Sequence, residues 1–140
     1  MEYDRKLAEL FEQEDRAREM ASRLMQIAQT SRAAASAERA SLIAFLRGPM
    51  EHHMAYEERA LFPQLIEHGL APEVQVATKH RASLRQAADK LEAAPADADV
   101  ASLVFDVARL MLHHTNFEGD YIYPELDHAA WLELMKASVT

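Results

Sequence analysis

The apolar residues at the start of the chain repeat at the spacing of one buried helical face. They lie mostly three or four positions apart and comprise Leu7, Leu10, Ala17, Ala21, Leu24 and Ala28. This periodicity predicts an amphipathic helix over about residues 3–29. Glu14 stands on the same line, where a core residue is expected. A carboxylate at that position is the first candidate for chemistry inside the fold.

Three further helical patterns follow, over about residues 37–61, 72–93 and 100–118. The connection before the second pattern is predicted over residues 30–36, with Ser36 as the N-cap. Gly48 and Pro49 interrupt the second pattern, and they predict a kink because proline lacks a backbone N–H. Gly69 and Pro72 are typical of one helix end followed by the next helix start.

The third pattern has its apolar positions at Val76, Leu84, Ala87, Ala88 and Leu91. His80 lies one turn from both Val76 and Leu84, so we expect its side chain on the buried face. The sequence AAPADAD that follows predicts a turn, with Asp97 or Asp99 capping the fourth helix.

The composition favours an all-α fold. The chain has 3 glycines, is dominated by good helix formers and lacks runs of Val, Ile and Thr. Four long helices with short connections predict an antiparallel up-down-up-down four-helix bundle, formed by residues 1–140 as a single domain. Asp127 is expected to cap a short C-terminal helix that holds Trp131, Leu134 and Met135.

The charge and the cysteine count exclude several classes of function. A formal net charge of -8 argues against binding to nucleic acid or to an anionic membrane surface. The absence of cysteine excludes disulfides, thiolate metal sites and cysteine nucleophiles. No apolar run is long enough for a membrane span, and the charged N-terminus has no secretory signal. We therefore predict a cytoplasmic protein.

Two segments of the chain match each other without gaps. HHMAYEERALFPQL begins at His52, and HHTNFEGDYIYPEL begins at His113. Each carries a histidine pair, then an aromatic residue and a glutamate, and ends with a proline two positions before a leucine. The second and fourth helices are therefore interpreted as two copies of one unit.

The repeat places a histidine and a glutamate four residues apart in each copy. His53 pairs with Glu57, and His114 pairs with Glu118. Residues at this spacing share one helix face, about 5 to 6 Å apart at Cβ, so a ring nitrogen and a carboxylate oxygen can converge on a cation. With Glu14 and His80, every helix directs a possible ligand inward. Burying these groups without a cation would be costly.

These residues resemble the hemerythrin-like, or HHE cation-binding, domain family over nearly the whole chain. The element HxxxEExxLFP is matched by His53, Glu57, Glu58, Leu61, Phe62 and Pro63. The resemblance implies a four-helix bundle with two irons bridged by Glu57 and Glu118. It implies that the ligands are His53, Glu57, His80, His114 and Glu118. Zinc and manganese are the alternative metals.

The first helix departs from the family pattern. The family usually has a histidine there, whereas this chain reads LFEQEDRA, so Glu14 or Asp15 would be the ligand. Alternatively, Glu14 could pair with Arg18, four residues on. Gly119 follows Glu118, where a second glutamate is common. The resulting oxygen-rich set favours ferric iron. We therefore expect oxidation, or chemistry with oxygen, peroxide or nitric oxide, rather than reversible oxygen carriage.

Three functional hypotheses follow from the sequence. The first is a di-iron protein that binds or senses oxygen, nitric oxide, iron or redox state. The second is an oxidoreductase that reduces peroxide, oxygen or nitric oxide at the same centre. The third is a mononuclear or structural metal site in an interaction module. The expected partner is a diatomic or peroxide ligand, and the sequence leaves the oligomeric state open.

Overall fold

The computed structural model describes residues 2–95 and 97–122, with side chains described from residue 8 onwards. The first long helix, α1, spans Glu2–Thr30 and leads into the short helix α2, Arg32–Ala37. The second arm of the bundle is built from five consecutive helical segments, α3 (Arg39–Phe45), η1 (Leu46–Met50), α4 (Glu51–Tyr56), η2 (Glu57–Leu61) and α5 (Phe62–Glu67). The remaining arms are α6 (Ala71–Ala93) and α7 (Val100–Phe117), which η3 (Glu118–Ile122) extends.

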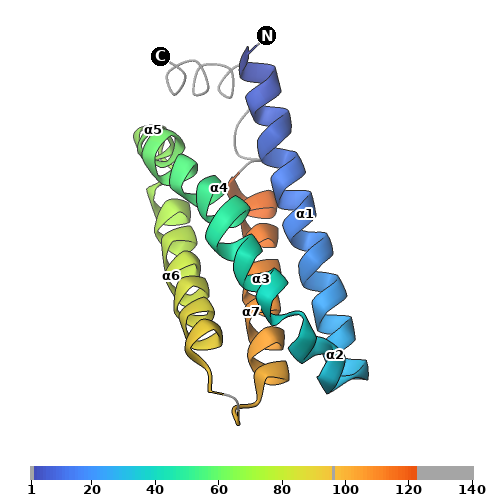
Figure 1. The fold of residues 1–140 in the computed structure, drawn as a ribbon. Helices are drawn as coiled ribbons and strands as arrows, with labels where there is room; N and C mark the ends of the chain where they lie inside the picture. Colours follow the sequence, from blue (N-terminus) through green and yellow to red (C-terminus); the bar gives the residue numbers. More distant parts are fainter. Residues whose placement is uncertain (1, 96, 123–140) are drawn as a thin grey trace.

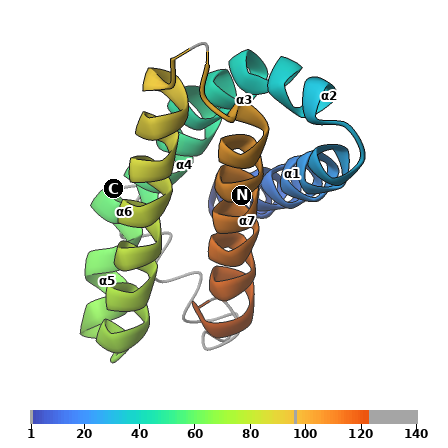
Figure 2. The same ribbon diagram turned by 90° about the horizontal axis from the view of Figure 1, so that it is seen from below.

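The four arms form the antiparallel all-α bundle that the sequence predicted (Figure 1). Along the chain, α1 descends, the α3–α5 arm rises, α6 descends and α7 rises (Figure 1). α7 packs against both α1 and α6, and Figure 2 shows α6 and α7 side by side. The expected helix capped by Asp127 lies outside the described residues. None of the described helices combines the length and the apolar character that crossing a bilayer requires.

The helix ends confirm some predictions and correct others. The Asp99 side chain accepts from the Ser102 N–H and caps α7, as one of the two predicted alternatives. Gly69 ends the second arm with a φ of +91°, a conformation that glycine adopts without strain. The predicted connection over residues 30–36 was wrong, because Ser31 rather than Ser36 is the N-cap and the following alanines form α2. Alanine has the highest helix propensity, so a three-alanine run favours a helix over a loop.

The three η segments are π-helices, in which N–H groups bond to the carbonyl five residues back. The Glu51 N–H donates to Leu46 O, and the Phe62 N–H donates to Glu57 O. Pro49 lies within η1 and Pro63 follows η2. Proline has no N–H and its ring crowds the carbonyl of the preceding turn, so a widened turn accommodates it. The kink predicted at Gly48 and Pro49 is thus a π-helix.

The widened turns keep side chains that are four residues apart on the same face of the helix. His53, Glu57, Leu61 and Leu65 are all buried, although each step of four in a regular α-helix drifts by about 40° around the axis. The second copy repeats the arrangement with His114, Glu118 and Ile122. Both π-helices begin at the glutamate of the repeated unit, so the wide turn belongs to the repeat and positions that glutamate toward the core.

A polar layer divides the core into two apolar blocks. One block includes Ala17, Met54, Leu84 and Met111. The other block includes Leu10, Leu61, Ala77 and Ile122. Between them lie the buried polar residues Glu14, His53, Glu57, Arg81, His114 and Glu118. The bundle therefore concentrates its buried charge at a single level.

Candidate metal centre

Glu14 is the residue of α1 that enters the polar layer. Its side chain is 3% exposed, whereas that of Asp15 is 72% exposed. Arg18 reaches back along the helix and places Nη2 3.5 Å from Glu14 Oε2. The two readings of Glu14 are therefore compatible: it is buried at the centre and it also pairs with Arg18. Glu14 Oε1 has no hydrogen-bond partner.

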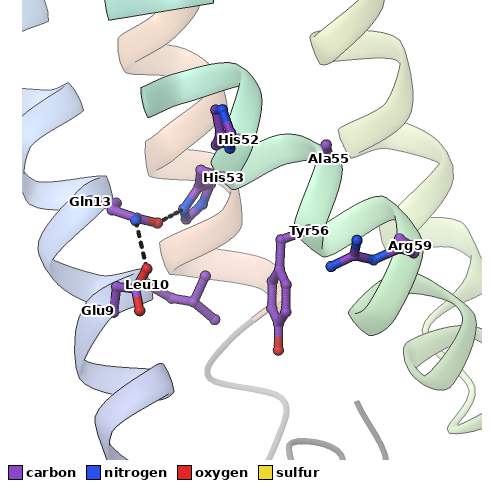
Figure 3. A pocket seen from close by; sticks show the side chains of 8 residues that line it. All are labelled: Glu9, Leu10, Gln13, His52, His53, Ala55, Tyr56 and Arg59. Atoms are coloured by element: carbon purple, nitrogen blue, oxygen red, sulfur yellow. Dashed lines mark hydrogen bonds between the residues drawn. The ribbon is translucent and has the colours of Figure 1, made fainter. Parts of the chain in front are cut away.

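His53 and Glu57 approach Glu14 from the second arm. His53 Nε2 lies 3.1 Å from Glu57 Oε1 and 3.6 Å from Glu14 Oε1. On its other edge, His53 Nδ1 donates to Gln13 Oε1 at 2.7 Å, and Gln13 Nε2 donates to Glu9 Oε1 at 3.2 Å (Figure 3). This chain of hydrogen bonds orients the imidazole and directs Nε2 into the cluster, as outer-sphere partners of metal-bound histidines do.

His114 and Glu118 enter the layer from the end of α7. Both are buried, and His114 Nε2 lies 2.6 Å from Glu118 Oε1. Neither nitrogen of His114 has a hydrogen bond. His114 is not one of the four residues whose ligand atoms lie within 4.8 Å of one another, which are Glu14, His53, Glu57 and Glu118, so its role as a ligand remains a prediction. The second copy of the repeat thus presents its histidine and glutamate inward like the first.

Arg81 of α6 is the residue of the centre that the sequence reasoning missed. Its side chain is fully buried, at 0% exposure. Its Nη2 donates to Glu57 Oε1 at 2.5 Å and to both oxygens of Glu118 at 3.2 Å. Its Nη1 donates to Met54 O at 3.0 Å. The buried face of α6 is Val74, Ala77, Arg81, Leu84, Ala88 and Leu91, a strict alternation of three and four that could have revealed the arginine.

His80 lies outside this cluster. Its ring is partly exposed, and its centroid lies 4.5 Å from that of the tilted His113 ring and 5.0 Å from that of the Phe117 ring, which it meets edge to face. The prediction that Val76 marks the buried face was wrong, since Val76 is 39% exposed. His80 therefore lies on the same face of α6 as Val76, and not on the buried face that includes Arg81. Its role as a ligand remains a prediction from the family resemblance.

Arginines from two helices enclose the centre. Arg18 donates to Asn116 Oδ1 and to Thr115 O, so it connects α1 to α7 beside Glu14. A Cβ at Gly119 would lie 2.8 Å from Arg18 Nη2. The absence of a side chain at Gly119 therefore leaves room for this arginine. On the opposite side, Arg85 binds the carboxylate of Glu58, which is partly exposed.

The donor set fits a cation. Glu14, His53, Glu57 and Glu118 each offer a ligand atom, and these atoms all lie within 4.8 Å of one another. Ligand atoms bound about 2.1 Å from one ion lie at most about 4.2 Å apart, so a small side-chain adjustment brings all four to bonding distance. Glu14 Oε1 and His53 Nε2, neither of which makes a hydrogen bond, lie 3.6 Å apart within this cluster. Carboxylate and imidazole ligands suit iron, manganese and zinc.

Burial and mutual repulsion shift the pKa values of these groups. Burial raises the pKa of Glu14 to about 7, and burial together with Glu57 raises that of Glu118. Burial lowers the pKa of His53, but Glu57 and Glu14 outweigh this and raise it to about 10. Burial lowers the pKa of His114 to about 4, and Arg81 adds to the effect. In the metal-free protein, protons therefore offset part of the charge that a cation would neutralise.

The metal-free protein is expected to be less stable at pH 9 than at pH 7. The pKa of Glu14 rises from 4.5 to about 7 on folding, and that of His53 rises from 6.5 to about 10. The folded state thus binds more protons than the unfolded state, and this stabilisation is lost as pH rises through the folded pKa values. Urea unfolding of the protein in the presence of a chelator, at pH 7 and at pH 9, measures this loss of stability. Glu14→Gln, which takes up no proton at this position, should lose less stability between the two pH values. A wild type whose urea midpoint rises from pH 7 to pH 9 would contradict these pKa shifts.

Replacing Gln13 with alanine is expected to weaken cation binding by about 10- to 100-fold, because the imidazole of His53 loses the acceptor that orients it. Competition titration of the purified variant against a chelator of known affinity measures the change. Gln26→Ala is the matched control, since Gln26 is exposed on the same helix. Equal losses in both variants would show that the effect is not due to the hydrogen bond with His53.

A cavity of about 270 Å³ opens beside the centre, between α1 and α4 (Figure 3). Among its lining residues are His53, Gln13, Tyr56 and Arg59. His53 is the single member of the four-residue cluster that lines it, and Gln13, which is hydrogen-bonded to His53, lines it as well (Figure 3). The cavity therefore contacts the outer side of the ligand sphere.

Comparison with known protein families agrees with this geometry. The family described as the hemerythrin HHE cation binding domain matches residues 5–126, most of the chain. No curated protein and no solved structure matches the chain. The match extends over α1 to η3, and so includes every residue of the polar layer. With its all-α bundle and its buried cluster of glutamates and histidine, the chain belongs to the hemerythrin HHE cation-binding domain family.

Proposed function

We propose that this domain binds iron in its core and uses it to bind or sense a small ligand such as oxygen, nitric oxide or peroxide. The observation that carries the proposal is the convergence of Glu14, His53, Glu57 and Glu118, all buried, with ligand atoms within 4.8 Å of one another. Buried carboxylates without a counter-charge are costly, and a cation removes that cost.

The donor set supports iron among the candidate metals. Three carboxylates and an imidazole form a hard, oxygen-rich set that stabilises the ferric state. Four protein ligands leave open positions on a six-coordinate ion, and iron supplies redox chemistry and ligand binding there when it is bound. The expectation of two bridged irons remains a prediction, and one ion accounts for the four converging ligand atoms.

The protein residues prepare the centre for a small ligand. Gln13 orients His53, Arg18 pairs with Glu14, and Arg81 binds the carboxylates of Glu57 and Glu118. The polar layer is flanked on both sides by apolar blocks of the core. Ligands at most a few atoms in size are expected to enter such a buried site. The cytoplasmic location inferred from the sequence is part of this proposal.

Metal analysis of three proteins tests the proposal. Wild type, Glu14→Ala and His80→Ala are purified after anaerobic loading with ferrous iron, and their metal content and visible spectra are compared. We expect iron in the wild type and its loss in Glu14→Ala. Loss of iron in His80→Ala would assign His80 as a further ligand, and retention would place it outside the ligand set. Asp15→Ala is the matched control for Glu14→Ala, since Asp15 is the exposed neighbour. A well-folded wild type without bound metal would contradict the proposal.

Ligand binding is tested on the loaded wild type. A spectral change on addition of nitric oxide or oxygen without turnover supports a binding or sensing role. Steady-state consumption of peroxide or nitric oxide would instead assign the oxidoreductase role. Iron that responds to none of these ligands would assign a structural role to the ion.

A further inference from the structure

We propose that Arg81 occupies the position of a second cation and restricts the centre to one metal ion per chain. This inference rests on the proposed function, because it concerns the composition of the same centre. Arg81 lies in the polar layer with 0% exposure. Arg18 and Arg85, which flank the centre, have side chains 32% and 34% exposed. Arg81 is therefore a component of the layer itself.

The guanidinium engages the two carboxylates that a pair of ions would share. Its Nη2 lies 2.5 Å from Glu57 Oε1 and 3.2 Å from each oxygen of Glu118. A carboxylate that bridges two ions uses both of its oxygens as ligands. Both oxygens of Glu118 are within hydrogen-bond distance of Arg81, so a second ion would have to displace the guanidinium from them.

Further contacts hold the guanidinium in place. Its Nη1 donates to Met54 O at 3.0 Å, and its Cζ lies 4.3 Å from the centre of the Phe62 ring. Glu58 Oε1 lies 3.5 Å from the same Nη1. Because these partners belong to the second arm of the bundle, displacing the side chain would break contacts between α6 and that arm. Withdrawal of Arg81 to admit a second ion is therefore costly.

The charge of the layer agrees with one ion. Glu14, Glu57 and Glu118 carry three negative charges when ionised, and Arg81 carries one positive charge, which leaves two negative charges. One divalent ion neutralises the layer. Two divalent ions beside the guanidinium would leave an excess of positive charge in a buried region, which is unfavourable. The four converging ligand atoms likewise define one ion site.

Titration with Mn²⁺, followed by electron paramagnetic resonance, tests the proposal. We expect wild type and Arg81→Lys to saturate at about one Mn²⁺ per chain with the spectrum of an isolated ion. Arg81→Met, which removes the charge, is expected to bind about two, with the spectrum of a magnetically coupled pair, as ions in two-metal sites lie about 3.5 to 4 Å apart. Arg85→Gln is the matched control one turn along α6 and should match the wild type.

Each outcome has a defined meaning. A coupled pair in the wild type would overturn this inference and leave the proposed function intact. A folded Arg81→Met that still binds about one ion would show that Arg81 does not set the number of ions. If Arg81→Met fails to fold, Arg81→Gln decides, because glutamine keeps an N–H donor without the charge. A folded wild type that binds neither Mn²⁺ nor ferrous iron would overturn the proposed function itself.

Discussion

Replacing Glu57 with glutamine is expected to abolish tight cation binding and to lower the free energy of unfolding of the metal-free protein by about 3 kcal/mol. Glu57 is fully buried and is the partner of both Arg81 and His53. Removing its charge leaves the guanidinium with fewer counter-charges in the core. We expect the cation affinity to fall by more than about 100-fold, because a direct ligand is lost as well.

Glu58→Gln is the matched control for Glu57→Gln. Glu58 is the next residue in the chain, its side chain is 37% exposed and its main partner is the partly exposed Arg85. Its substitution should change the free energy of unfolding by less than about 0.5 kcal/mol. Urea unfolding in chelator and metal competition titration measure the two effects separately. If both variants lose equal stability, the buried ion pair of Glu57 with Arg81 is not the cause.

Removal of the metal is expected to produce the second large effect. A cation present at about 100 times its dissociation constant stabilises the folded state by about 2.7 kcal/mol, because it binds the folded state and not the unfolded one. For a domain of this size the melting temperature should then fall by roughly 8 °C when a chelator is added. Differential scanning calorimetry with and without chelator measures the change.

The same measurement on Glu57→Gln separates the centre from other cation sites. That variant should melt at one temperature with or without chelator, because it has lost a ligand of the centre. A chelator effect of equal size in the wild type and in the variant would place the stabilising ion elsewhere. No effect of chelator or added metal on the wild type would contradict a stabilising ion in the core.

Much of the centre could be predicted from the spacing of residues in the sequence. Glu14 was identified because it interrupts an apolar stripe of α1, and the structure buries it. The pairs at a spacing of four in the two repeat copies are buried as expected. These predictions worked because a helix converts sequence spacing into position on a face. The exposure of Asp15 distinguishes it from Glu14, as the stripe had indicated.

Arg81 was missed because the face of α6 was assigned from too few apolar residues. Ala77 is small and weakly apolar and was not assigned to the buried face, so Val76 and the neighbouring His80 suggested a phase that is wrong by one position. The rule that charged residues avoid the core does not point to a buried arginine either. That rule fails where carboxylates are buried nearby, because the arginine then has partners that only the three-dimensional arrangement reveals.

The π-helices could not be predicted with the usual helical periodicity. A period of 3.6 residues treats His53, Glu57, Leu61 and Leu65 as drifting around the helix, whereas the structure buries all four. The signal was present as a spacing of four from His53 to Leu65, a stretch that includes Pro63. It was not interpreted because a proline is usually taken to bend a helix rather than to widen it.

The polar layer also determines how far each helix is shifted along its neighbours. In an apolar core, a helix displaced by one turn, about 5.4 Å, meets side chains much like those it left. Here the same displacement would move a carboxylate or the guanidinium of Arg81 into an apolar block, away from its partners. A few buried polar contacts can exclude such alternative alignments even where they add little stability. The centre therefore fixes the axial register of the helices relative to one another, in addition to providing the ligands for an ion.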